Sequence, residues 1–341
     1  MYKIAIVGAS SLLGRELKDV LAESPLAAGN IVLLDEDDAQ GQLDQIGDEV
    51  AFIQALRADA FEHTDFTFFC GSQMLTLRHW RQAQQAGSTV LDLTGALDRE
   101  PGVLIRAPWL GRETAAVDLF TPAIVPADPA VIPIALLLDR LSQAAPIRLA
   151  AATILEPASE FGRAAMDELH QQTISLLNFQ PLPRSVYDAQ TAYNMLCGMG
   201  EASAVNLALV EDRIRRHYEA LTGGRGPALT VQVIHAPVFH GHTFSIAVEF
   251  ERPVEIPSLD GLLNSEHLDV VVEDTDSPSN LAATGQDDIL VRLRVEPMAR
   301  NSYNTQRLWL WAAADNLRVH AQNAVQCALE LRRLRPQGTV Q

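Results

Sequence analysis

The first residues that could carry chemistry lie near the N-terminus, where glycines separate an apolar run from a polar, helix-like segment. Gly8 and Gly14 flank the sequence ASSLL, and the apolar run at 2–7 precedes them. Glycine between a strand and a helix lets backbone amides approach a phosphate at the helix N-terminus, although many α/β proteins use such a turn for packing alone. The turn therefore indicates a phosphate or dinucleotide site without establishing one.

Three histidines in the second half of the chain, His235, His240 and His242, could bind a metal or transfer protons. If one strand carries all three, His240 and His242 share a face because side chains alternate along a strand, and His235 points to the opposite face. This arrangement does not favour a site with three ligands. We therefore predict no metal site.

The cysteines offer a further kind of chemistry, because a thiolate is nucleophilic. Cys70, Cys197 and Cys327 are odd in number and widely spaced, with no CxxC pair among them. This usage favours a reducing, cytoplasmic location over a disulfide framework. Cys197 and the nearby Met195 are expected to pack against the second domain as hydrophobic residues.

Length and composition favour a two-domain globular protein. The chain has 341 residues, of which 48% are hydrophobic and 20% charged, and this balance can supply two buried cores. Its net charge of −17 would repel nucleic acids and anionic membranes. The longest apolar stretch, at 130–138, contains Pro133 and is too short to cross a bilayer, and the N-terminus lacks the pattern of a signal peptide. Neither nucleic acid nor a membrane is expected as a partner.

The elements that must position these residues alternate in type through the first half of the chain. Apolar, β-branched runs lie at 2–7, 31–34, 66–70 and 90–93, and segments with helical spacing of apolar residues lie between them. Strands that alternate with helices predict a parallel sheet wound with right-handed crossovers.

The second half has a different pattern, in which extended segments follow one another with helical stretches inserted. Extended segments lie at 149–155, 229–235, 243–250, 270–273 and 289–295, and helical stretches at 164–176 and 202–218. This α+β pattern predicts an antiparallel or mixed sheet with helices on one face and the other face free to pair with a second subunit. Residues 315–334 are expected to form a long helix that returns to the first domain.

Short motifs occur in a fixed order along nearly the whole chain. They are VGASSLLGREL, Cys70-Gly71-Ser72, DLTGALD from Asp92, VPADPA, ASEFG, Tyr193-Asn194, PVFHGH and Asp315-Asn316-Leu317-Arg318. In order and spacing they resemble the motifs of the aspartate-semialdehyde dehydrogenase family. The chain as a whole resembles a divergent, usg-type homologue of that family that lacks the catalytic cysteine. The resemblance implies a Rossmann-like NAD(P)-binding domain formed by 1–127 and 315–341, and an α+β dimerisation domain of the semialdehyde dehydrogenase type at 128–314.

Enzymes of that family attack a carbonyl with a cysteine thiolate, and the resemblance places Asp128 where this cysteine stands. A carboxylate is a poor nucleophile toward an aldehyde, so we interpret Asp128 as the N-cap of the following helix, with Pro129 at the first helical position. His242 falls at the position of the family's acid–base histidine. Without a thiol beside it, we interpret His242 as an inherited structural residue held by hydrogen bonds. Glu156 occupies the position of the glutamine that orients the acyl intermediate.

The resemblance also shows changes where the family binds substrate. Two arginines grip the substrate carboxylate and the phosphate in the family, because a guanidinium matches the geometry of an oxyanion. Their positions hold His235 and Asp98 in this chain. An aspartate at the second position would repel a phosphate rather than bind it.

The implied dinucleotide site is altered as well. The resemblance assigns to it Gly8, Ser11, Gly14, Asp35, Gly71 and Asn316, with Ser11 in place of the middle glycine. Asp38 falls where NADP-using relatives have an arginine for the 2′-phosphate. An acidic cluster there disfavours NADP, whereas Asp35 or Glu36 could accept a ribose hydroxyl of NAD. No cofactor is required, and NAD is the one that the chain could hold.

The sequence leaves three functions open. The first is a non-catalytic homologue, inactive as that dehydrogenase, that acts as a homodimer or tetramer through a surface or an unknown small-molecule ligand. The second is an NAD-dependent oxidoreductase of this type, in amino-acid biosynthesis, with altered chemistry in which His242 is the base. The third is hydrolysis by Asp128 and His242, which no other residue supports. Whether the chain is an enzyme thus stays open.

Overall fold

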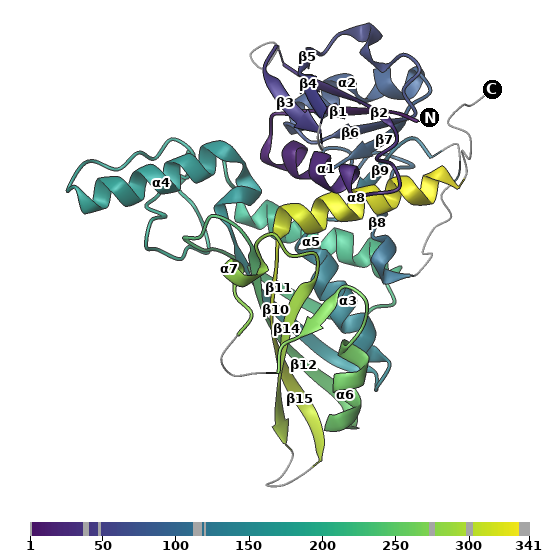
Figure 1. Ribbon diagram of the computed structural model, residues 1–341. Helices are drawn as coiled ribbons and strands as arrows, with labels where there is room; N and C mark the ends of the chain where they lie inside the picture. Colours follow the sequence, from purple (N-terminus) through teal and green to yellow (C-terminus); the bar gives the residue numbers. More distant parts are fainter. Residues whose placement is uncertain are drawn as a thin grey trace. The chain divides into compact units, whose positions relative to one another are not determined.

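The computed structural model describes residues 2–36, 41–46, 49–111, 118, 121–272, 277–297 and 303–333 (Figure 1). They form two compact units. One comprises Met1–Asp128 and His320–Gln341, and the other comprises Pro129–Val319.

The first unit contains a seven-stranded, fully parallel sheet with the order β5-β2-β1-β6-β7-β9-β8. Its strands are β1 Lys3–Val7, β2 Asn30–Asp35, β5 Gln54–Ala55, β6 Phe66–Phe69, β7 Thr89–Asp92, β8 Leu104–Arg106 and β9 Ile124–Pro126. A small hairpin of β3 Leu43–Ile46 and β4 Glu49–Phe52 stands apart from it. Short, apolar strands buried on both faces are what a parallel sheet requires, so the parallel sheet expected of the N-terminal half is confirmed.

Helices cover both faces of this sheet. α1 Leu12–Ala22 and α2 Gln73–Gln85 follow β1 and β6, and short 3-10 turns lie at η2 Ala58–Phe61 and η3 Pro108–Leu110. α8 Asn316–Arg332 contributes its later turns to the same core as β1 and α1. Arg106 forms an ion pair with Glu330 at 2.8 Å, and the Asn323 side chain donates to the Arg106 carbonyl. The last helix thus returns to the first unit, as expected.

The second unit contains a six-stranded mixed sheet with the order β11-β10-β12-β15-β14-β13. Its strands are β10 Ile147–Glu156, β11 Leu229–His235, β12 His242–Glu255, β13 Leu268–Val270, β14 Ile289–Pro297 and β15 Asn304–Ala314. The sequence prediction missed β15, which lies in the middle of the sheet. Its alternation is hidden in the sequence because both faces carry apolar residues, with Leu308 and Leu310 on the buried face and Trp309 and Trp311 on the other.

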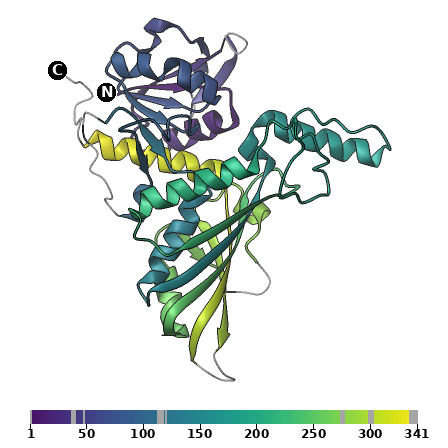
Figure 2. The same ribbon diagram turned by 180° about the vertical axis from the view of Figure 1, so that it is seen from behind.

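Helices line one face of the second sheet. They are α3 Val131–Ser142, α5 Leu207–Thr222 and α6 Ile256–Leu263, with α4 Arg163–Leu177, α7 Asn280–Ala283 and the 3-10 turn η4 Ala158–Phe161 completing the unit. α3 packs on β10, α5 on β11 and α6 on β12, and both views show α3 and α6 on the same side of the strands (Figures 1 and 2). α5 begins later than predicted because Asn206, and not a residue near 202, caps its N-terminus.

No helix within the described ranges is long and apolar enough to span a membrane. The apolar stretch at 130–138 instead forms most of α3. Nine of the twelve residues of that helix are buried, which is typical of a helix inside a core.

Candidate functional site

The carboxyl ends of the parallel strands gather several of the candidate residues in the first unit. Ligands bind open parallel sheets at this edge, where the connections from two neighbouring strands leave in opposite directions. Here β2 lies on one side of β1 and β6 on the other, so this point lies at Gly8, which follows β1, and Gly71, which follows β6. A Cβ on Gly8 would lie 2.3 Å from the Gly71 nitrogen, and Gly8 has a φ of +84°. Only glycine fits there.

Ser11 fills the turn with internal hydrogen bonds. Its hydroxyl accepts from the Gly14 amide at 2.9 Å and donates to the Cys70 carbonyl at 2.9 Å. A Cβ on Gly14 would lie 2.5 Å from the Gly8 carbonyl oxygen. Ser11 is thus the N-cap of α1, and packing alone already explains both glycines.

Asp35 ties the second strand to the same turn. Its carboxylate accepts from the Ser10 amide at 2.8 Å and from the Glu36 amide at 2.9 Å, and its side chain is buried. A carboxylate has about four acceptor positions, so room for a ribose hydroxyl remains. Asp38 lies outside the described residues.

Two further candidate residues, Asp98 and Asp128, follow strands of the first sheet at the same edge. Asp98 follows a turn that the buried Asp92 organises by accepting from the amides of Thr94 and Leu97. Burial raises the pKa of Asp92, and its hydrogen bonds with Thr94 and Leu97 oppose that rise. Asp128 follows β9 and is buried. The prediction that it caps the next helix is wrong, because α3 begins at Val131 and its N-cap residue is Ala130, which makes no side-chain capping bond.

The second unit places three candidate residues in one row across neighbouring strands. Glu156 pairs with His235 in the parallel ladder of β10 and β11, and the antiparallel ladder of β10 and β12 continues from Leu155–Thr243 to Glu156 and His242 at the strand ends. Residues opposite one another in a ladder share a face. The expectation that His235 points away from His242 is wrong, because the two histidines lie on different strands.

This row lies on the helix-covered face of the sheet. Along β10 the same face carries the buried residues Ala150, Ala152 and Ile154 before Glu156, and along β12 it carries Phe244 after His242. The row is therefore the polar end of an apolar core layer. Polar groups in such a place must find partners inside the protein or bind a ligand.

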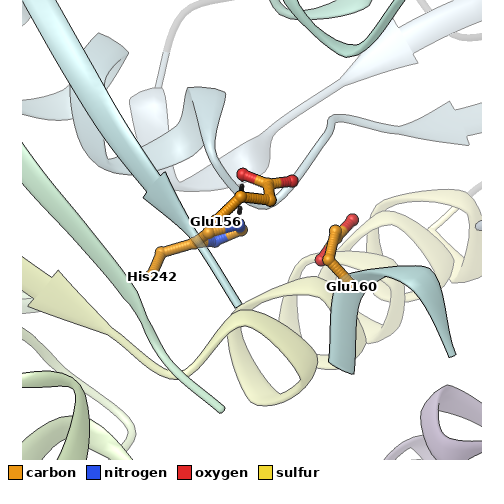
Figure 3. Close-up of side chains that lie close together, drawn as sticks. All are labelled: Glu156, Glu160 and His242. Atoms are coloured by element: carbon orange, nitrogen blue, oxygen red, sulfur yellow. Dashed lines mark hydrogen bonds and ion pairs between the residues drawn. The ribbon is translucent and has the colours of Figure 1, made fainter. Parts of the chain in front are cut away.

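Glu156 and His242 are partners in this row. The Glu156 Oε2 and the His242 Nε2 lie 3.1 Å apart, and the two side chains are 1% and 0% exposed (Figure 3). When His242 carries a proton on both nitrogens, this contact is a buried ion pair. His242 is thus held by a hydrogen bond to Glu156, the residue that the resemblance places at the family's glutamine position.

Glu160, on η4, brings a second carboxylate to the pair. Ligand atoms of Glu156, Glu160 and His242 all lie within 4.8 Å of one another. The Asn316 amide donates to Glu160 at 3.1 Å, while its oxygen accepts from the Ser159 hydroxyl and the Gly241 amide, both at 3.1 Å. Asn316, which the resemblance assigns to cofactor binding, is buried and fixes the position of Glu160 in the second unit.

His235 extends the row but finds no hydrogen-bond partner for its ring. Both ring nitrogens are buried, and no protein atom in the described parts of the chain bonds to either. Its ring lies 4.8 Å from that of the buried Tyr187, centroid to centroid, and the Tyr187 hydroxyl also lacks a partner there. Burial lowers the pKa of His235 to about 4, so its imidazole is neutral near pH 7.

The thiols lie elsewhere. Cys70 and Cys327 belong to the hydrophobic core of the first unit, and burial raises the pKa of each thiol far above its usual value. Cys197 and Met195 are exposed in the second unit. The expectation that these two residues pack as hydrophobic side chains is wrong for this chain.

Three residues of the second-unit site escaped the sequence interpretation. Glu160 appeared only as part of the ASEFG motif, although its spacing of four residues from Glu156 could have drawn notice. Tyr187 and Arg213, which lies 4.0 Å from Glu160, come from distant segments. No local pattern in the sequence marks either of them.

Comparison with protein families gives matches that together span most of the chain. Residues 3–126 match the model described as "Semialdehyde dehydrogenase, NAD binding domain", and residues 138–319 match "Semialdehyde dehydrogenase, dimerisation domain". The first match covers the parallel sheet, and the second covers the whole of the mixed sheet. The two-domain fold class expected from the sequence is thereby confirmed.

Curated relatives match over nearly their whole length. A USG-1 protein homolog of Pseudomonas aeruginosa is 30% identical over 94% of this chain and 95% of its own. An aspartate-semialdehyde dehydrogenase of Rickettsia conorii is 26% identical over 97% of each. Among solved structures, a probable aspartate-semialdehyde dehydrogenase from Pseudomonas aeruginosa has a TM-score of 0.84 at 28% identity, covering 97% of this chain and 98% of that one.

Proposed function

The chain belongs to the semialdehyde dehydrogenase family, and from that premise we propose that it is a dimeric homologue that has lost the thiol-dependent oxidation of a semialdehyde. One observation carries this proposal. In the sequence, none of the cysteines Cys70, Cys197 and Cys327 occupies the nucleophile position, which the resemblance assigns to Asp128. A carboxylate cannot replace a thiolate that must both attack an aldehyde and leave from a thioester.

The substrate-binding positions support the same proposal. His235 and Asp98 stand where two arginines would hold the anionic groups of the substrate. His235 is buried, and burial lowers its pKa to about 4, so its imidazole supplies no positive charge near neutral pH. Asp98 adds a negative charge. Neither residue offers the paired N–H groups with which a guanidinium holds an oxyanion.

The NAD(P)-binding domain retains part of what a dinucleotide needs. The amides of residues 8–11 and 14 are bonded within the unit, whereas those of Leu12 and Leu13, in the first turn of α1, have no acceptor among the described residues. Leu12 and Leu13 would hold a pyrophosphate, and Asp35 a ribose hydroxyl. A bound NAD would supply a hydride acceptor. Asp35 favours NAD over NADP because it would repel a 2′-phosphate.

The dimer follows from the second unit. Its family model is that of a dimerisation domain, and the sheet face opposite α3 and α6 exposes Leu149, Trp309 and Trp311, at 44%, 44% and 38%. Apolar side chains on one sheet face favour burial against a second copy. We expect a homodimer, or a tetramer built from it, with 128–314 as the dimerisation domain. The cytoplasmic location expected from the cysteines stays a prediction.

The proposal is tested by a phosphate-dependent assay with aspartate semialdehyde and either NAD or NADP, run beside an active family member. We expect turnover at least about a hundredfold below that control, which is a difference of ~2.7 kcal/mol in the activation barrier. Turnover within that factor would contradict the loss of function.

One observation favours a second candidate, an NAD-dependent oxidoreductase in which His242 is the base. The buried contact between Glu156 and His242 is the arrangement that orients a histidine for proton transfer. Calorimetric titration of NAD and NADP separates the two candidates. Tight NAD binding that His242→Gln leaves intact, together with an oxidation that His242→Gln abolishes, would establish the second. If neither NAD nor NADP gives a binding signal, the result supports the first candidate, the homologue without dehydrogenase activity.

A further inference from the structure

The cluster of Glu156, Glu160 and His242 brings two carboxylates and one imidazole together away from water. Their ligand atoms lie within 4.8 Å of one another, and the Arg213 Nη2 lies 4.0 Å from Glu160 Oε1. Glu156 is 1% exposed and Glu160 is partly buried. Carboxylates removed from water require compensating positive charge, and a bound cation would supply it where the two carboxylates meet.

We propose that Glu156, Glu160 and His242 bind a divalent transition-metal ion of the zinc class. The site goes beyond the proposed function and does not rest on it, because metal binding is compatible with either candidate. It also replaces the sequence-based expectation that the chain has no metal site.

The distances fit one ion. Ligand atoms bonded to a tetrahedral Zn²⁺ lie about 3.3 Å apart, given metal–ligand bonds of about 2.0–2.1 Å. The Glu156 Oε2 and the His242 Nε2 are 3.1 Å apart, and the Glu160 carboxylate completes a triangle with no side longer than 4.8 Å. Figure 3 shows the three side chains converging from η4 and two strands.

A second, independent observation points to a ligand at this place. His235, beside Glu156 in the same row, is 0% exposed, and neither of its ring nitrogens has a hydrogen-bond partner among the described residues. The Tyr187 hydroxyl, whose ring packs against that of His235, also has no partner there. Burial of such groups without hydrogen bonds is costly, and native proteins compensate it with a bound ion or the water that the ion carries. A metal with an open coordination position would supply that water.

The supporting contacts are those of a metal site. Asn316 holds the Glu160 carboxylate through a 3.1 Å bond and is itself fixed by Ser159 and Gly241. Metal-binding carboxylates are commonly positioned by a hydrogen bond of this kind. Ser159 lies next to Glu160 and Gly241 next to His242, so Asn316 couples two of the ligand-bearing segments.

The ligand types select the class of ion. Imidazole nitrogen favours Zn²⁺, Co²⁺ and Fe²⁺ over Mg²⁺ and Ca²⁺, which prefer oxygen ligands alone. Three protein ligands leave a position open, as in catalytic rather than structural zinc sites. The family's glutamine in place of Glu156 would be neutral and a weaker ligand. The change to glutamate is therefore what creates the site.

The test is metal binding by the full chain after removal of metal with a chelator. Calorimetry with ZnCl₂ should give one ion per chain, and CoCl₂ should produce the visible absorption of four- or five-coordinate Co²⁺. Glu156→Gln, Glu160→Gln and His242→Asn should each abolish the absorption. Asn316→Ala should weaken Zn²⁺ binding by about 10–100-fold, as loss of a supporting contact does.

Two substitutions serve as matched controls. His240→Asn removes a histidine two positions from His242, and Glu266→Gln removes a glutamate whose side chain is 87% exposed. Both variants should bind Zn²⁺ as the wild type does. Circular dichroism and thermal unfolding establish that each variant is folded. X-ray absorption at the zinc edge of the wild-type protein, which needs no substitution, should show one imidazole bound to the ion.

The proposal is overturned if the wild-type protein binds no Zn²⁺. It is equally overturned if Glu156→Gln and His242→Asn bind Zn²⁺ as tightly as the two control variants do. The same holds if the X-ray absorption spectrum of the bound zinc shows no imidazole ligand. The outcome is separate from the dehydrogenase assay, because an inactive protein that binds Zn²⁺ at these residues supports both proposals, and an active one supports this proposal alone.

Discussion

The turn at Gly8 in the first unit and the row at Glu156 in the second differ in how their polar groups are satisfied. In the turn, Ser11 and Asp35 bond the loop's own amides, so the substituted residues complete the structure. In the row, His235 is buried with two ring nitrogens that no described protein atom bonds. The polar groups of the turn are thus bonded within the protein, whereas the ring nitrogens of His235 still require a hydrogen-bond partner.

If the dehydrogenase activity has been lost as proposed, this difference indicates that such a loss need not change both units alike. A side chain that caps a helix adds stability and reduces the polar groups left for a ligand. A buried polar group without a hydrogen-bond partner destabilises the folded protein. The destabilisation is relieved when a ligand, ion or water binds that group. The second unit is therefore where a present function is more strongly indicated.

The largest expected effect comes from restoring the family's residues in one unit or in both. Asp128→Cys alone should leave semialdehyde oxidation more than about a hundredfold below an active member, because His235, Asp98 and Glu156 neither grip nor orient the substrate. Positioning can account for roughly 7–11 kcal/mol of a barrier. The combination of Asp128→Cys with Asp98→Arg, His235→Arg and Glu156→Gln should give more turnover in the same assay.

A variant with substitutions in the first unit alone shows how much each unit contributes to the loss of turnover. The first-unit pair Asp128→Cys and Asp98→Arg serves as the control for the combined variant. If this pair is already as active as the combination, the replaced residues of the second unit are irrelevant to the loss.

The next effect concerns the close approach in the turn. Gly8→Ala should destabilise the protein by about 3 kcal/mol or more, because it combines left-handed backbone with a collision against Gly71. Gly87 has a similar φ of +86° and nothing within 4 Å of the added Cβ. Gly87→Ala should cost only about 1–2 kcal/mol. Denaturant unfolding measures both, and equal losses would remove the special role of the Gly8–Gly71 contact.

A smaller effect concerns the pH dependence of the row. Burial lowers the pKa of His235 to about 4 from an ordinary value of 6.5. Between these values the unfolded chain binds the proton and the folded chain does not, so stability is complete above about pH 6.5 and falls as pH decreases toward 4. From about pH 7.5 to about pH 5, the wild type should lose about 2 kcal/mol that His235→Phe does not lose.

The control for that measurement is Tyr187→Phe, which removes the neighbouring unpartnered hydroxyl. Burial raises the pKa of Tyr187, so this residue does not titrate in the acid range. Tyr187→Phe should keep the pH dependence of the wild type in metal-free protein. If His235→Phe keeps it too, His235 is not the group responsible.

The smallest effect concerns Ser11, whose hydroxyl bonds the Gly14 amide and so keeps that amide from binding a phosphate. Ser11→Gly should cost a few tenths of a kcal/mol through loss of the cap of α1. It should tighten NAD binding by about fivefold, or ~1 kcal/mol, because the Gly14 amide becomes available to a phosphate. Ser72 caps α2 in the same manner, and Ser72→Gly should cost similar stability with no change in NAD affinity. Equal NAD binding by wild type and Ser11→Gly would show that the serine does not obstruct the turn.

Much of the first unit could be predicted from the sequence because its signals are local. The run before Gly8 and the helical spacing after it lie within one strand–turn–helix segment, and apolar runs repeat the pattern. Side chains in buried parallel strands are apolar on both faces, so each strand is recognisable by itself.

The row at Glu156 could not be predicted, because it depends on register between distant strands. His235 and His242 are close in sequence, and periodicity along a single strand places them on opposite faces. The chain instead leaves β11 at His235 and enters β12 at His242, with β10 between them in the sheet. Ladder register follows from tertiary packing, which no local spacing encodes.

The polar row also has a consequence for how the second sheet assembles. If β12 paired with β10 two residues out of register, the apolar face of β12 would still be buried, but His242 would no longer lie beside Glu156, which would lose its partner. The Glu156–His242 contact therefore disfavours a strand alignment that the alternation of apolar and polar residues alone would allow.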